Sequence, residues 1–152
     1  MSTRILGATM ILLLAACGAT ALARTAQAPQ PADYAWAESC RKCHGAVYDA
    51  WAKTKHAAAL SRLSAAEQAT DCVGCHLTGP KTPLLDGMKV LNGGVQCEAC
   101  HGAAKAHVAE PSVKAGLTRI PASELCEACH SDKSPRFKGF IYGPMVGLSH
   151  KR

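Results

Sequence analysis

Four segments of the chain repeat the pattern Cys-x-x-Cys-His, which places two thiols and one imidazole at a fixed spacing. They are motif one (Cys40–His44), motif two (Cys72–His76), motif three (Cys97–His101) and motif four (Cys126–His130). On a helical turn, residues three and four apart share one side, with Cβ atoms about 5–6 Å apart. Two such thiols can form thioethers to the vinyl groups at one porphyrin edge, and the histidine that follows can bind the iron.

Zinc sites and disulfides also use closely spaced cysteines. Neither explains why a histidine follows the second cysteine in every motif. With seven histidines in 152 residues, four such followers would arise by chance in roughly a few cases per million. The pattern therefore predicts four covalently bound haem c groups and no structural disulfide. The predicted attachment residues are Cys40, Cys43, Cys72, Cys75, Cys97, Cys100, Cys126 and Cys129, and the predicted proximal iron ligands are His44, His76, His101 and His130.

Three histidines remain outside the motifs, namely His56, His107 and His150. Each is a candidate second iron ligand, and the alternative for each is an ordinary surface histidine. If all three bind iron, three haems have two histidine ligands and the fourth has an open position for a small molecule. Met88 and Met145 are further candidates for that position, because methionine with histidine is a known haem ligand pair; packing is their other expected role.

The segments around the motifs predict short helices and loops. Aromatic residues make up only 5 % of the chain, so we expect the haems to fill the core and haem-free protein to be largely unfolded. The expected fold class is mainly α, with little sheet, wrapped around four haems. The individual predictions are a helix over 46–63, a short helix over 64–70 with Ser64 and Glu67 as a capping box, Asp71 as the N-cap of the motif-two helix, a loop over 79–94 with a small ribbon at 88–91, a connector over 111–121 and irregular structure from residue 131 onward.

The N-terminus resembles an export signal. Arg4 precedes an apolar run over 5–16 that is too short to span a bilayer. The run ends in Leu-Ala-Ala before Cys17, which resembles the lipobox of bacterial lipoproteins, and the alternative is ordinary cleavage after residue 23. The predicted organisation is a signal peptide over 1–16 (or 1–23), a tether over 17–33 and a haem domain over 34–152. We expect a periplasmic or other extracytoplasmic location, with Cys17 as a possible lipid anchor.

The motifs and their flanking residues resemble the cytochrome c554 family of tetrahaem proteins. The resemblance rests on motif one followed by Trp51 and His56, on Asp71 before motif two, and on the segment Gly94–Gly102 around motif three. It implies a mostly helical fold with haems packed in close pairs. It also implies that His56 binds the iron of another haem, that the histidine soon after motif three (here His107) is a distal ligand, and that the motif-two haem has an open position.

In that family the last distal histidine comes from a longer C-terminal extension. Here His150 is the only histidine left for the haem of motif four. His150 is therefore the candidate ligand for that haem, and the alternative is that two haems are open rather than one.

The charge balance argues against nucleic acid as a partner. The chain carries 17 Lys and Arg against 11 Asp and Glu, but the propionates of four haems would cancel most of this excess. The expected partners are redox proteins. The first hypothesis for function is an electron carrier; the alternatives are a haem subunit of a membrane-bound redox complex and an oxidoreductase that reduces nitric oxide or a similar ligand at the open haem on His76.

Overall fold

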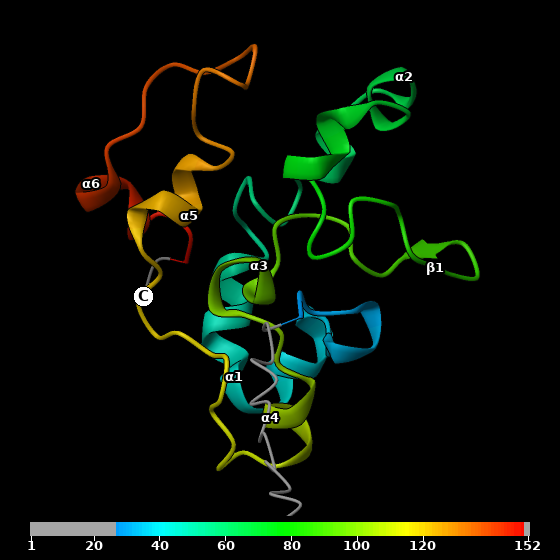
Figure 1. Cartoon of the computed structure of the whole chain (residues 1–152), viewed down its shortest axis with the longest axis vertical. Helices are drawn as coiled ribbons and strands as arrows, with labels where there is room; N and C mark the ends of the chain where they lie inside the picture. Colours follow the sequence, from blue (N-terminus) through cyan, green and yellow to red (C-terminus); the bar gives the residue numbers. More distant parts are fainter. Residues whose placement is uncertain (1–26, 151–152) are drawn as a thin grey trace, which may run out of the picture.

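The computed structural model describes residues 27–150, and the predicted signal peptide and Cys17 lie outside this range. Short helices joined by long loops make up nearly all of it (Figure 1). The α-helices are α1 (Ala37–Trp51), α2 (Ala65–Gln68), α3 (Cys97–His101), α4 (Lys105–Ala109), α5 (Ser123–Glu127) and α6 (Tyr142–Val146). The 3-10 helices are η1 (Pro31–Asp33), η2 (Leu60–Arg62) and η3 (Asp71–Cys75), and the strands are β1 (Leu85–Asp86) and β2 (Lys89–Val90).

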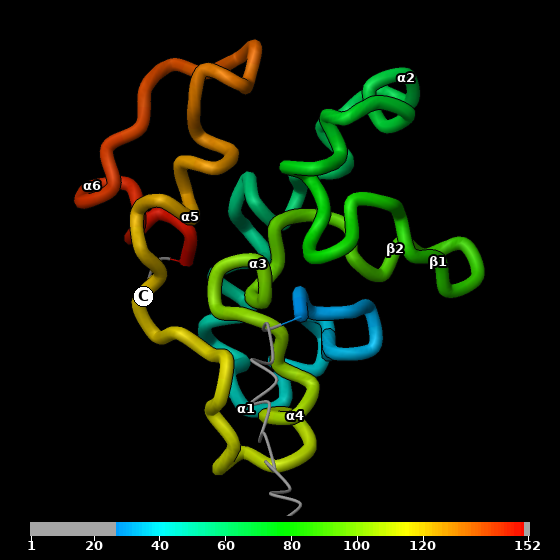
Figure 2. The backbone as a smooth tube through the Cα atoms, viewed as in Figure 1, coloured from blue at the N-terminus to red at the C-terminus, as the bar shows by residue number. Residues whose placement is uncertain are grey.

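The helices gather in three regions. In Figure 1, α1, α3 and α4 occupy the lower centre, α2 and the β-hairpin the upper right, and α5 and α6 the upper left. Helix α1 packs on α3, α4 on η1, and α2 on η3. The tube in Figure 2 shows that long loops connect the three regions. The predicted class, mainly α with little sheet, is confirmed. No helix within residues 27–150 has the length and apolar character needed to cross a bilayer.

The first long helix starts and ends earlier than predicted. The expected range was 46–63, whereas α1 covers Ala37–Trp51 and includes motif one. The backbone N–H of Ala37 donates to the side chain of Gln96, which supports the new start. At the other end, the indole of Trp51 donates to the carbonyl of Val95. These contacts come from residues more than forty positions away, so helical periodicity alone could not indicate them.

Other predicted elements agree with the structure. Ser64 caps α2, and Glu67 completes the capping box. The small ribbon is the antiparallel hairpin β1–β2, in which Leu85 pairs with Val90.

Three predictions were wrong. Thr70, not Asp71, caps η3, because its hydroxyl accepts from the N–H of Cys72. The end of the expected tether forms η1. Helix α6 interrupts the irregular C-terminal segment, and Pro144 is tolerated there because it lies in the first helical turn.

Polar residues form much of the interior. Thr78 and Asn92 are fully buried, and Gln96 and Glu98 nearly so. The Asn92 amide accepts from the N–H of Leu84 and donates to the carbonyls of Pro80 and Thr82, which ties the loop between motifs two and three together. The buried apolar side chains of the described residues are Tyr34, Ala37, Ala59, Val73, Leu77 and Ala104, which are mostly small.

Candidate haem-binding site

All four motifs have local helical structure. Motif one lies within α1, where the helix kinks at His44. Motif two ends η3, motif three is α3 itself, and motif four begins in the last turn of α5. The eight cysteines of the motifs are free thiols. This local geometry places each cysteine pair on one turn, as thioether attachment to a single porphyrin requires.

Thiols from different motifs lie close together. The interaction between Cys40 and Cys97 raises the pKa of the Cys40 thiol and lowers that of Cys97. Burial, followed by the interaction with Cys75, raises the pKa of Cys129 to about 12. Burial raises the pKa of the Cys100 thiol most, and the nearby Cys126 raises it further. Cysteines of motif one therefore lie near those of motif three, and cysteines of motif four lie near those of motifs two and three.

Three histidines are held in a tautomer suited to metal binding. The Nδ1 atoms of His76, His101 and His107 lie 2.6, 2.7 and 3.0 Å from backbone carbonyl oxygens. A carbonyl oxygen only accepts, so each Nδ1 carries the hydrogen. The unprotonated nitrogen of each ring is therefore Nε2, the arrangement that a hydrogen-bonded metal ligand commonly shows.

Two of the leftover histidines face histidines of the motifs. The ring centres of His56 and His130 are 5.8 Å apart, and those of His101 and His150 are 6.2 Å apart. Two imidazoles on opposite sides of one metal ion have centres roughly 6 Å apart, because each metal–nitrogen bond is about 2 Å long. Burial and the neighbouring His130 also lower the pKa of His56, which favours the neutral form that binds metal.

These pairs correct one expectation. His150 was the one candidate for the haem of motif four, but its ring faces His101 of motif three. His56 faces His130 of motif four. The tail brings His150 back to α3 through α6, a route that the sequence spacing does not indicate. Met88 is fully exposed at the tip of the hairpin, so it packs against no histidine.

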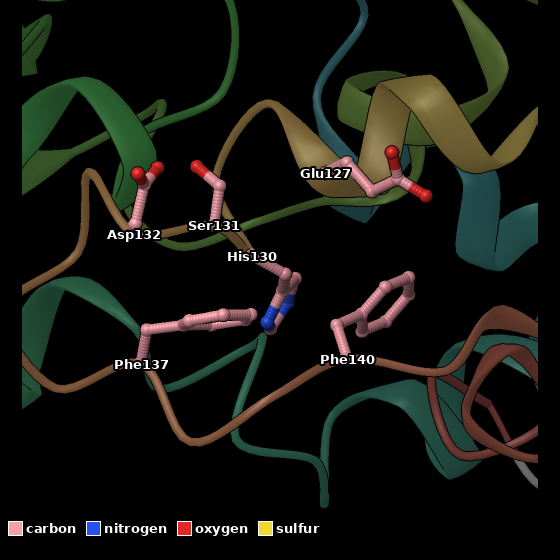
Figure 3. Close-up of a pocket in the computed structure, with 6 residues that line it drawn as sticks. All are labelled: Glu127, His130, Ser131, Asp132, Phe137 and Phe140. Carbon is pink, nitrogen blue, oxygen red and sulfur yellow. The ribbon is translucent and has the colours of Figure 1, made fainter.

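The surroundings of motif four fit a flat apolar group. His130 stacks against Phe140, with ring centres 4.9 Å apart. Both residues, with Phe137 and the polar residues Glu127, Ser131 and Asp132, line a cavity of about 300 Å³ (Figure 3). Large apolar side chains next to the motifs in sequence are also exposed, at Val47 after motif one and Leu125 before motif four. The motif residues and these apolar side chains together fit haem c: thiols for the porphyrin edge, Nε2 atoms for iron and apolar side chains for the ring faces.

Comparison with known proteins agrees with this geometry. Residues 39–102, which hold motifs one to three, match the family model described as cytochrome c554 and c-prime. Residues 39–102 are therefore similar to the cytochrome c554 family, in agreement with the haem c attachment that the motifs predict.

The chain also has a curated relative. Cytochrome c-554 of Nitrosomonas europaea is 32 % identical over 85 residues, which cover 43 % of this chain and 36 % of the relative. The chain therefore matches little more than a third of that protein's length.

Two solved structures are similar to large parts of the chain. The reduced state of cytochrome c554 from Nitrosomonas europaea has a TM-score of 0.52 and 24 % identity, covering 81 % of this chain and 79 % of that one. The outer cell wall cytochrome OcwA has a TM-score of 0.47 and 16 % identity, covering 65 % of this chain and 37 % of that one. The first match shows that the chain shares the cytochrome c554 fold.

The sequence did not reveal the buried polar residues that hold motif three in place. Gln96 accepts from the N–H of Ala37 and donates to the carbonyls of Leu91 and Gly93. Thr78 accepts from the N–H of Gln96. The residue types carried no signal of this role, because Thr and Gln are mostly surface residues.

Proposed function

We propose that the chain is a periplasmic tetrahaem c-type cytochrome that passes electrons between redox proteins. Bound haem iron supplies one-electron exchange between its ferric and ferrous states. The observation that carries the proposal is the approach of side chains that are far apart in sequence: Cys40 lies beside Cys97, Cys75 beside Cys129, and the ring centres of His56 and His130 are 5.8 Å apart. Haems attached at these cysteines would lie near one another, as electron transfer between them requires.

The histidine pairs support this role. His130 with His56, and His101 with His150, provide two nitrogen ligands each. Iron with two histidine ligands exchanges electrons without binding other molecules. His107 belongs to the third pair: it lies on α4, which packs against η1, the turn that precedes α1 and motif one. His107 and His44 are therefore assigned to the motif-one haem.

The assignment of His107 leaves His76 of motif two with an open iron. This favours a second candidate function, the binding and reduction of a small molecule such as nitric oxide at that iron. Lys81 is near motif two, with its side chain 3.8 Å from the position of a Cβ built on Gly74. The electron carrier remains the first proposal.

The haem count and ligands can be tested on the mature holoprotein. Mass spectrometry is expected to give the polypeptide plus four haems, and the electron paramagnetic resonance spectrum of ferric protein one high-spin and three low-spin haems. Replacing His56, His107 or His150 by alanine is expected to add one high-spin haem each. A mass with fewer haems, or four low-spin haems in the native protein, contradicts the assignment.

The carrier role requires electrons to leave the protein. Dithionite-reduced protein is expected to pass four electrons to an excess of an oxidised monohaem cytochrome c. Transfer of fewer electrons would show that one or more haems are isolated. Carbon monoxide binding to the reduced protein tests the second candidate: one equivalent is expected, and none would exclude an open iron.

Export and anchoring form part of the proposal, because haem attachment of this kind takes place outside the cytoplasm. If Cys17 is lipidated, labelled palmitate enters the protein and the cell's membrane fraction retains it. Cys17→Ala should abolish both. Normal labelling of Cys17→Ala would show that the lipid is attached elsewhere, and an unlabelled native protein would favour cleavage after residue 23.

A further inference from the structure

Motifs three and four have the same sequence, Cys-Glu-Ala-Cys-His, but their glutamates have different surroundings. Glu98 of motif three is 4 % exposed, whereas Glu127 of motif four is exposed. Figure 3 shows Glu127 at the edge of the cavity beside His130. The two positions therefore provide a natural comparison between a buried and a solvated carboxylate at the same place in the attachment motif.

Three backbone N–H groups hold the Glu98 carboxylate. Oε1 accepts from Ala35 at 2.9 Å and from Ala104 at 2.8 Å, and Oε2 accepts from Trp36 at 2.7 Å. Hydrogen bonds of this kind stabilise an ionised carboxylate. The two ion pairs found within residues 27–150, Arg41 with Asp49 and Arg136 with Glu67, do not include Glu98. Its negative charge is thus buried and held by dipoles alone.

The charge acts on the sulfur atoms that attach haem. The hydrogen bond with Cys97 raises the pKa of the Cys40 thiol most, and burial raises it next. The nearby Glu98 raises this pKa further. The interaction with Cys40 lowers the pKa of the Cys97 thiol, whereas Glu98 raises it. Burial raises the pKa of Tyr34, and Glu98 again adds to it. At Cys40, Cys97 and Tyr34, Glu98 therefore disfavours the negatively charged form of the side chain.

We propose that Glu98 is a positioning residue that also lowers the reduction potential of the haem on motif three. Reduction adds an electron beside a buried carboxylate, so the ferric state is favoured. Glu127 cannot do the same, because water screens its charge. The haems of motifs three and four, each with a pair of histidines, therefore differ in potential through the burial of one carboxylate.

The inference rests on the proposed four-haem protein, so haem content is measured first, by mass. Potentials of the holoprotein are then followed by spectroscopic titration, with the two haems assigned from the low-spin signals that His150→Ala and His56→Ala remove. Glu98→Gln is expected to shift the ferrous-to-ferric equilibrium of the motif-three haem about tenfold toward ferrous iron, which equals about 59 mV for one electron. Glu124→Gln, the matched control at an exposed carboxylate on α5, is expected to change this equilibrium less than twofold.

Glu98→Asp separates charge from position. It keeps the charge and shortens the side chain, so the equilibrium is expected to stay within about threefold of native protein. Equal shifts in Glu98→Asp and Glu98→Gln would mean that lost packing, not lost charge, changes the potential, and would overturn the proposal. An unchanged potential in Glu98→Gln would also overturn it.

Native protein provides a test that needs no Glu98 variant to mature. The motif-three haem is expected to have a lower potential than the motif-four haem. An equal or higher potential would refute the role of Glu98 while leaving the four-haem count intact. A mass below four haems would instead refute the proposed function.

Discussion

Gly94 connects the loop before motif three to the backbone beside His56. Its N–H donates to the carbonyl of His76, and the N–H of the next residue, Val95, donates to the carbonyl of His56. Its φ is +85°, and a Cβ placed there would lie 2.5 Å from the carbonyl oxygen of Ala57 and 3.1 Å from that of His56. Glycine alone avoids both the strained φ and the close contact.

Gly94→Ala is expected to lower the free energy of unfolding by about 2–5 kcal/mol. The positive φ costs about 1–2 kcal/mol, and relief of the overlap with backbone costs about 1–3 kcal/mol. The 56–57 segment must move to make room, which takes His56 away from His130. We therefore expect the motif-four haem to change from low-spin to high-spin as well.

Denaturant unfolding and paramagnetic resonance of the ferric protein measure the two effects. Gly87→Ala is the matched control: its φ is +58°, and nothing lies within 4 Å of the added Cβ. It is expected to cost about 1–2 kcal/mol with no change of spin. If both variants lose the same stability and keep the same spin state, Gly94 does not hold His56 in position and the reasoning fails.

Three other predictions concern the scaffold. Trp51→Phe removes the hydrogen bond to Val95 and is expected to lower the unfolding free energy by about 1 kcal/mol; an unchanged midpoint in denaturant would contradict this. Asn92→Ala removes three hydrogen bonds and is expected to cost about 3 kcal/mol, and a loss below about 0.5 kcal/mol would show that water replaces them. Haem-free protein is expected to be largely unfolded, and a native-like circular dichroism spectrum would refute that.

The sequence by itself determined the attachment chemistry. Two cysteines and a histidine within five residues need only one helical turn to act together, so each motif is a local unit and is recognisable without the fold. The capping box of Ser64 and Glu67 and the hairpin at Gly87 were predictable for the same reason, because residues a few positions apart decide them.

Tertiary structure alone decided which motifs His56 and His150 meet. His56 reaches His130, and His150 reaches His101, across separations that no local pattern encodes. The end of α1 likewise depends on Val95, which is far along the chain.

The pair Glu98 and Glu127 shows the same limit most directly. Their motifs are identical in sequence, yet one carboxylate is buried under three backbone N–H groups and the other is solvated. Local sequence specifies which atoms can bond to a haem. Long-range packing sets the dielectric and hydrogen bonds around those atoms, because the groups that supply them come from distant parts of the chain.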